Sequence, residues 1–296
     1  MEFDWRKNHR RLVESSKNLR LTLKPKLEKY NLSASHLNTF LDIGRGGPNS
    51  WLVDKLIRFP TKKNREAIFG IAVHEALHKQ HCMISEGQAF DIEKSIEVFV
   101  NLINKSQLGD DEKNHLIVRG KEALKSYLIN SRTYFHKDQK SEYIVPRDKV
   151  VINGVRVNGI IDLIELDKTN KSIIVVDYKT GRSFSEWKQK DVKHNLKLNR
   201  YKKQLIFYKL MIEGYLEFSG YKVKSGELRF VEPDENGNIN TLQTNFEDND
   251  IEDFRQILVN VWNSMINLNF PKTDDLKEGI RDQRIFLQRL AELNNS

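Results

Sequence analysis

The chain has a single cysteine, Cys82, among its 296 residues. One cysteine cannot form an intramolecular disulfide, and it excludes any metal or iron–sulfur cluster held by several cysteines. Long apolar runs are also missing: no stretch of roughly 18 apolar residues occurs, so we expect no membrane-spanning helix and no membrane partner. The charged beginning MEFDWRKNHRRLVESS lacks the apolar segment of a secretory signal. We therefore expect a cytoplasmic protein.

Glycine-rich phosphate loops, internal repeats and low-complexity tracts are absent as well. Without a G-x-x-x-x-G-K-[ST] segment, we expect no ATP-driven motor in these residues. What is present is an ordinary globular composition, with 39% hydrophobic and 30% charged residues. This composition and length suffice for one large domain or two modest ones with a sizeable hydrophobic core.

Positive charge is in excess and unevenly placed. The formal net charge is +8 and the sequence pI is about 9.3, which hints at a polyanionic partner. Residues 1–30 are basic and weakly patterned, and we expect them to form a linker or docking arm. A second basic run, 188–203, contains Lys193, Lys197, Lys202 and Lys203. Such a run is either a solvated face or a track for a nucleic-acid backbone.

Hydrophobic periodicity divides the chain into a helical first half and a mixed second half. The helices expected in the first half are one capped by Ser33 or Ser35 and others over 51–58, 64–80, 90–105 and 111–130. Residues 141–181 alternate β-branched side chains with turn signals, which predicts three or four strands. The elements expected after them are a helix over about 197–214, a hairpin turning at Asn236-Gly237 and a helix capped by Asp250. An α/β fold with a mixed sheet follows.

The segment VHEALH, Val73 to His78, matches H-E-x-x-H. In zinc proteases, two histidines at this spacing bind the metal and the glutamate acts as a base. This gives one alternative function, a zinc metalloprotease using His74, Glu75 and His78. The extended form of the motif fails, because the next histidine comes too early and no glycine precedes it. Glu97 could supply the third zinc ligand.

A hairpin over Gly159 to Lys179 carries two acids in apolar surroundings. If Thr169-Asn170 form the centre of its turn, Asp162 lies directly opposite Asp177, with Cβ atoms about 4.5–5.5 Å apart. Lys179 then shares their face of the sheet. Two carboxylates placed so repel each other and lose hydration, and a divalent cation relieves both costs. Oxygen ligands favour Mg²⁺ or Mn²⁺.

Five motifs occur in the order of a known family. They are LSASHLNTF (Leu32 to Phe40), FGIAVHEAL (Phe69 to Leu77), GIIDLIE (Gly159 to Glu165), VVDYKTG (Val175 to Gly181) and QLIFY (Gln204 to Tyr208). The pattern D…D-x-K resembles the PD-(D/E)XK nuclease superfamily, and more closely the RecB-like nuclease domains fused to UvrD-type helicases. Ile161 stands where the name of the superfamily places a proline, but RecB-like members often lack that proline.

The resemblance implies a restriction-endonuclease-like core over 31–296, with a mixed central sheet flanked by helices and a helical N-terminal part. It implies that the metal ligands are His74, Asp162, Asp177 and the carbonyl of Tyr178. The implied catalytic residues are Asp162, Asp177 and Lys179, with Lys179 orienting the attacking water or stabilising charge on the phosphate. Gln204 and Tyr208 would face the substrate strand, and the lysines of the basic run would hold its backbone.

From this we expect a metal-dependent DNA nuclease acting as a single-strand exonuclease in DNA repair or recombination. Its partners would be single-stranded DNA and a helicase motor, in cis or in trans. The iron–sulfur cluster of some relatives is excluded, because Cys82 is alone. Besides the zinc protease, a catalytically idle DNA-binding domain of a helicase stays open as an alternative. Endonucleolytic cleavage and an RNA substrate stay open as well.

Overall fold

The computed structural model describes residues 17–60 and 64–295. Its centre is a five-stranded sheet in the order β1-β2-β3-β4-β5. The strands are β1 (Gln139–Ile152), β2 (Val155–Asp167), β3 (Ser172–Lys179), β4 (Lys222–Phe230) and β5 (Thr241–Asn245). Neighbouring strands are antiparallel except β3 and β4, which are parallel. The predicted mixed sheet is confirmed, and the strand-rich segment contributes three strands to it.

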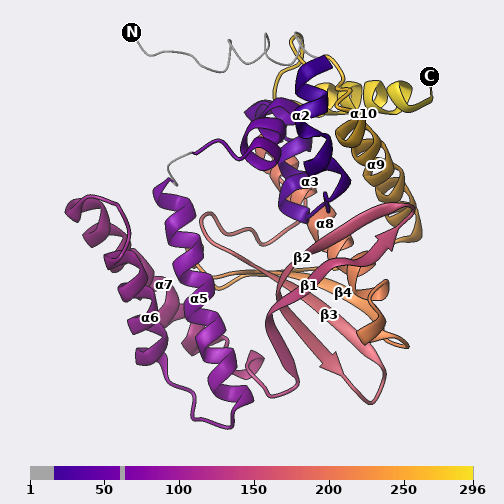
Figure 1. The fold of residues 1–296 in the computed structure, drawn as a ribbon. Helices are drawn as coiled ribbons and strands as arrows, with labels where there is room; N and C mark the ends of the chain where they lie inside the picture. The colour runs from indigo at the N-terminus through magenta and orange to yellow at the C-terminus, as the bar shows by residue number, and fades with distance from the viewer. Residues whose placement is uncertain (1–16, 61–63, 296) are drawn as a thin grey trace.

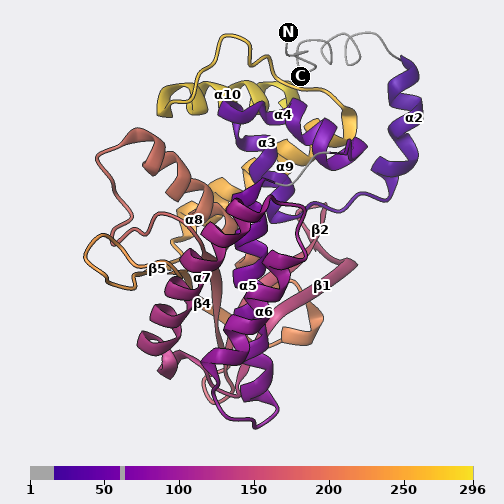
Figure 2. The same ribbon diagram turned by 90° about the vertical axis from the view of Figure 1, so that its left-hand side faces the viewer.

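Helices cover both faces of this sheet. The helices of the described residues are α2 (Lys17–Glu28), α3 (Ala34–Leu41), α4 (Gly47–Ser50), α5 (Arg65–Ser85), α6 (Ile92–Asn104), α7 (Asp110–Asn130), α8 (Val192–Glu213), α9 (Asp248–Asn267) and α10 (Ile280–Asn295). The short turns are η1 (Ile43–Arg45), η2 (Trp51–Ile57, a π-helix), η3 (Arg132–Tyr134) and η4 (Leu216–Phe218). Figure 1 shows α5, α6 and α7 on one side and α8 on the other, and Figure 2 views the first group face-on. The predicted flanking helices and helical N-terminal part are confirmed.

Helix α5 is fixed at its start and along one face. The side chain of Asn64 accepts the backbone N–H of Ala67 and so caps the helix. Phe69, Val73 and Leu77 follow at helical spacing and are fully buried against the sheet and the neighbouring helices. Truncating a buried phenylalanine such as Phe69 to alanine would lower the free energy of unfolding by about 3–5 kcal/mol. This packing holds the next face of α5, which carries His74, in a fixed orientation.

The register between β2 and β3 is the predicted one. Leu163 lies opposite Val176, and Asp167 lies opposite Ser172. The carboxylate of Asp167 holds the turn between the strands, because its Oδ1 accepts the backbone N–H of Asn170 at 2.9 Å. A slip by one residue would turn every side chain of the strand to the other face, so this turn decides which residues share the site.

Beyond Leu163 and Val176 the two strands separate. Strand β2 stays paired with β1 as far as Val155 opposite Ile152, whereas β3 stays paired with β4 as far as Lys179 opposite Phe230. A fork therefore opens in the middle of the sheet. Leu32, just before α3, bridges to the outer part of β2, where its N–H donates to the carbonyl of Arg156 at 2.9 Å. This bridge brings α3 to the fork.

Two predicted helix starts were wrong. Helix α9 begins at Asp248 with Glu247 in the capping position, so Asp250 lies in its first turn, where it pairs with Lys202. Helix α8 begins at Val192, five residues before the predicted 197, because the side chain of Asp191 accepts the N–H of His194. The helix α10 was not predicted.

The N-terminal segment packs on the domain where the structure describes it. Leu23 and Leu27 of α2 are buried in the same core cluster as Leu32 and Phe40. Residues 1–16 of the predicted arm lie outside the described residues, and the arm stays a prediction. Within the described part of the chain, no helix is both long enough and apolar enough to cross a membrane.

Candidate active site

The fork in the sheet holds three potential metal ligands. His74 of α5, Glu142 of β1 and Asp162 of β2 bring one ligand atom each within 4.8 Å of one another. His74 Nδ1 lies 3.5 Å from Asp162 Oδ1 and 3.7 Å from Glu142 Oε1. In the described part of the chain, this is the one such group of three or more histidines, cysteines and acids. One imidazole nitrogen and two carboxylates suit Mg²⁺ or Mn²⁺.

Glu142 was not predicted. Continued unchanged from Ile152 opposite Val155, the register would place Val145 opposite Asp162. An irregularity between Val145 and Val150 shifts the register, so Glu142 takes that place instead. The backbone of Glu142 has φ +48°, a conformation that is costly for a residue other than glycine. Strain of this kind is typical of functional sites.

Asp162 is oriented by the backbone of β3. Its Oδ2 accepts the N–H of Tyr178 at 2.8 Å, at the point where strand pairing between β2 and β3 has ended. Burial raises the pKa of Asp162, but the positive charge of His74 and the hydrogen bond from it outweigh burial and keep the pKa below its ordinary value. Asp162 is therefore the ionised carboxylate of the site.

Asp177 behaves in the opposite way. Its side chain is 2% exposed, and burial raises its pKa to about 6, with Lys179 opposing the shift and the charge of Asp162 adding to it. Two neighbouring carboxylates with pKa values moved apart are typical of a site that has to accommodate a cation or a proton.

The pKa of His74 is also shifted by its neighbours in the site. Burial lowers the pKa of His74, but the charge of Asp162 and hydrogen bonds with Asp162 and Glu142 outweigh it and raise the pKa to about 10. The three side chains thus stabilise one positive charge between them. A divalent cation can take the place of that proton.

A closed ring of contacts holds Lys179 beside Asp177. Lys179 Nζ lies 2.5 Å from Asp177 Oδ2 and donates to Gln204 Oε1 at 3.0 Å. Gln204 Nε2 donates to the hydroxyl of Tyr208 at 2.8 Å, and this hydroxyl donates to Asp177 Oδ1 at 3.5 Å. We call these four residues the Lys179 ring. It unites four residues predicted from two separate motifs, VVDYKTG and QLIFY.

Tyr178 turns its side chain away from this ring. Its hydroxyl lies 2.9 Å from His81 Nε2 on the α5 face of the sheet, where it is buried. The ligand predicted at Tyr178 is its carbonyl oxygen, and that role stays a prediction.

His78 does not join His74. Its Nδ1 lies 2.7 Å from the hydroxyl of Ser141, and Cys82 Sγ lies 3.5 Å from its Nε2. Glu75, which would be the base of a zinc protease, is exposed. Within the described residues, no ligand group combines His74 with His78. The zinc-protease alternative therefore has no support from the geometry.

Part of the predicted basic run pairs with acids of the protein itself. Lys202 Nζ lies 2.6 Å from Asp250, and Lys193 Nζ lies 3.9 Å from Glu278. Burial lowers the pKa of Lys203. Lys197 differs, because it lies against the same aromatic ring as the catalytic candidate Lys179. The Nζ atoms of Lys197 and Lys179 lie 5.6 Å and 4.0 Å from the centre of the Tyr201 ring. A role of the four lysines in DNA binding stays a prediction, and Lys197 is the one that leads toward the site.

Comparison with known proteins agrees with this geometry. The sequence pattern of the PD-(D/E)XK nuclease superfamily matches residues 31–277. Among solved structures, the "Putative exonuclease" from Eubacterium rectale is similar, with a TM-score of 0.51 and 12% sequence identity over 81% of this chain and 82% of that chain. At this identity the likeness concerns the fold. No curated protein matches in sequence. Because the superfamily pattern covers most of the sequence, the chain belongs to the PD-(D/E)XK nuclease superfamily.

Proposed function

We propose that the protein is a metal-dependent nuclease that hydrolyses DNA phosphodiester bonds, acting on single strands from an end. The observation that carries the proposal is the position of His74, Glu142 and Asp162 within 4.8 Å of one another, beside the pair of Asp177 and Lys179. The superfamily supports a nucleic-acid substrate, and the name of the Eubacterium rectale protein supports an exonuclease.

The ligand atoms fit a hard divalent cation. His74, Glu142 and Asp162 would hold Mg²⁺ or Mn²⁺, with Asp177 and the carbonyl of Tyr178 as further ligands. When bound, such an ion lowers the pKa of a water molecule and neutralises charge on the phosphate. His74 gives up its proton to become a ligand. The hydrogen bond from the Tyr178 N–H keeps Asp162 Oδ2 in place, so that Oδ1 faces His74.

Lys179 is the residue that would touch the reacting phosphate. It is 13% exposed, and burial lowers its pKa, but the charges of Asp177, Tyr201 and Asp162 together with the hydrogen bond to Asp177 outweigh burial and raise the pKa, so Lys179 stays protonated. A positioned cation of this kind stabilises the charge that develops on a phosphate oxygen, or holds the attacking water. Gln204 and Tyr208 position the ammonium group through the Lys179 ring and lie where a substrate strand would pass.

We further propose a RecB-like nuclease domain over 31–296 that works with a helicase. The order of the five motifs supports this, because each of them places a residue in or beside the fork. The sequence lacks a phosphate loop, so a motor would have to come from another part of a longer protein or from a partner.

The decisive experiment uses end-labelled DNA, both single-stranded and double-stranded, with Mg²⁺, Mn²⁺ or a chelator. We expect cleavage of single strands with either ion and none with the chelator. Circular single strands should be spared, because they have no end. Asp177→Asn should abolish cleavage, whereas Glu97→Gln, on the exposed face of α6, should not. If the wild-type protein binds DNA but cleaves none of these substrates, the idle accessory domain is the better description.

A further inference from the structure

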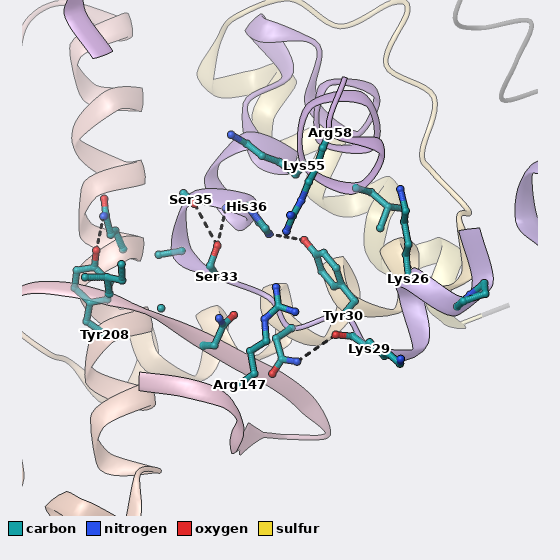
Figure 3. A pocket seen from close by; sticks show the side chains of 18 residues that line it. Lys26, Lys29, Tyr30, Ser33, Ser35, His36, Lys55, Arg58, Arg147 and Tyr208 are labelled. Carbon is teal, nitrogen blue, oxygen red and sulfur yellow. Dashed lines mark hydrogen bonds between the residues drawn. The ribbon is translucent and has the colours of Figure 1, made fainter. Parts of the chain in front are cut away.

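A cavity of about 770 Å³ opens beside the Lys179 ring. It lies between α2, α3, η2 and the β1–β2 hairpin, and Gln204 and Tyr208 form its inner end. Figure 3 shows Tyr208 at one side and the N-terminal helices at the other. The cavity is therefore continuous with the candidate active site. We call it the basic cavity.

All charged residues that line the cavity are cationic. They are Lys26, Lys29, Lys55, Arg58 and Arg147. They come from three elements far apart in the sequence, and none forms an ion pair with an acid in the part of the chain that the structure describes. Arg58 and Arg147 point into the cavity from opposite sides (Figure 3). Unpaired like charges in one concave site repel each other, which an anionic ligand would relieve.

The pKa of His36, which also lines the cavity, is lowered by these positive charges. Trp51 Nε1 donates to the hydroxyl of Tyr30 at 2.7 Å, and this hydroxyl lies at hydrogen-bond distance from His36 Nδ1, also 2.7 Å. Burial and the charges of Lys55, Arg58 and Arg147 lower the pKa of His36 to about 4. The ring is a neutral N–H donor in a cavity that disfavours any further positive charge.

Part of the cavity wall is apolar. Gly159 and Ile160 of β2 line it. Ile160 is 49% exposed, and Ile144, opposite it on β1, is 62% exposed. The face of β2 that carries Asp162 is therefore partly open to solvent at this end. Apolar side chains next to unpaired cations suit a ligand that has both phosphates and flat apolar surfaces, as a nucleic-acid strand does.

We propose that the basic cavity binds the single DNA strand next to the bond being cleaved, through two or three successive backbone phosphates. This rests on the proposed function, and it adds the path of the substrate. The volume lies within the range of about 300–1,000 Å³ for pockets that hold small ligands, so a few nucleotides of one strand fill it. The cations contact phosphates and not base edges, so binding is independent of sequence.

The test is the salt dependence of binding, measured without metal so that no cleavage occurs. A fluorescent oligothymidylate is titrated with the wild-type protein, with the triple variant Lys55→Gln, Arg58→Gln, Arg147→Gln, and with the control Lys105→Gln, Lys121→Gln, Lys125→Gln. The control removes the same charge from exposed positions near α7. We expect the cavity variant to flatten the slope of log K against log salt by about two, at about 0.7 per phosphate contact. The control should keep the wild-type slope.

A second arm locates the contacts along the strand. Neutral methylphosphonate linkages are placed one at a time beside the cleavage site. Each should weaken wild-type binding if it falls in the cavity, and should have little further effect on the triple variant. In the presence of Mg²⁺, the triple variant should show a raised KM and a nearly unchanged kcat. Arg147→Gln alone is a second test in case the triple variant misfolds. Because Arg147 is exposed, this single variant should fold, and it should flatten the salt slope by about 0.7.

The outcomes separate this inference from the proposed function. A wild-type salt slope in the triple variant would overturn the inference, even if the protein cleaves DNA. Inorganic phosphate that competes as strongly as the oligonucleotide would also overturn it, because the cavity would then be a small-anion site. If the triple variant flattens the slope but the wild-type protein cleaves no DNA, the proposed function fails, and the basic cavity is a single-strand binding site without cleavage.

Discussion

The backbone N–H of Tyr178 donates to Asp162 Oδ2 at 2.8 Å, across the fork where β2 and β3 part. This contact links one acidic strand to the other without strand pairing. It fixes one oxygen of Asp162 and leaves Oδ1 facing His74 at 3.5 Å. The site therefore depends on where strand pairing ends as well as on which residues are present.

The first prediction concerns Glu142. Glu142→Gln removes one charge from the ligand group but keeps the shape of the side chain. We expect it to weaken Mn²⁺ binding by more than about 100-fold, since even residues behind a ligand are worth about 10–100-fold, and to abolish cleavage at low metal concentration. Isothermal titration with Mn²⁺ measures the first effect. Glu97→Gln, on α6, is the matched control, and an equal effect of both variants would remove Glu142 from the site.

Alanine substitutions of the two histidines in the H-E-x-x-H segment should have very different effects on cleavage. His74→Ala should abolish cleavage, because His74 Nδ1 faces Asp162 and Glu142. His78→Ala should leave most of the activity, since its partner is the hydroxyl of Ser141. Cleavage rates and bound metal, measured by mass spectrometry on the purified proteins, test this. A zinc protease would need both histidines equally, so stoichiometric zinc lost from both variants would contradict the nuclease assignment.

Local sequence signals were enough to predict the acidic hairpin. The alternation of β-branched residues and the turn at Thr169-Asn170 gave the correct register, because Asp167 holds that turn through its side chain. Asp177 and Lys179 then follow on the same face from the twofold repeat of a strand. The helix with His74 was predicted from its periodicity, but its position over the fork came only from the family resemblance.

Glu142 and the basic cavity could not be predicted in the same way. Glu142 reaches Asp162 only through the irregularity between Val145 and Val150, and nothing local determines how many residues such an irregularity absorbs. The cavity joins Lys55 to Arg147, whose proximity is a tertiary property. Conversely, the conspicuous run 188–203 suggested a DNA track, but pairing of Lys202 with Asp250 links it to the acids that follow β5. The density of basic residues along a sequence does not show which of them pair with acidic side chains in the folded protein.

Breaking the Lys179 ring should lower kcat and leave the KM for DNA almost unchanged. Tyr208→Phe removes the hydroxyl that connects Gln204 to Asp177. Losing a buried hydrogen bond costs about 1–3 kcal/mol, so kcat should fall by about 5-fold to 150-fold through a less well-placed Lys179. The KM for DNA should change little. Steady-state kinetics measure both, and Tyr134→Phe, at an exposed position, should behave as wild type. A change confined to KM would assign Tyr208 to strand binding alone.

Single lysines of the basic run should differ from one another. Lys197→Gln should flatten the salt slope of DNA binding by about 0.7, the value of one phosphate contact, because Lys197 lies on the path to Lys179 through Tyr201. Lys202→Gln should leave the slope unchanged, because its charge is already paired with Asp250. Fluorescence anisotropy at several salt concentrations distinguishes them. Equal slopes for both variants and the wild type would show that this run is only a solvated face.

The last prediction links stability to pH through His36. Its pKa is lowered to about 4 in the folded protein, while an unfolded histidine titrates near 6.5. Below pH 6.5 the unfolded chain binds a proton that the folded one does not, so this residue destabilises the fold progressively as the pH falls from about 6.5 to about 4. The full effect is about 3 kcal/mol. Asn at this position can still accept from Tyr30 but does not titrate.

We therefore expect His36→Asn to lose less stability than the wild type between pH 6.5 and 4, in urea unfolding followed by fluorescence. His81, whose burial also lowers its pKa, contributes equally to both proteins and cancels in the difference. The charged groups facing His36 are Lys55, Arg58 and Arg147, beside the neutral hydroxyl of Tyr30, and a phosphate among them would offset their charge. Single-stranded DNA at low salt should thus raise the pKa of His36 and shrink the difference between the two proteins. A difference that DNA leaves unchanged would place the strand outside the basic cavity.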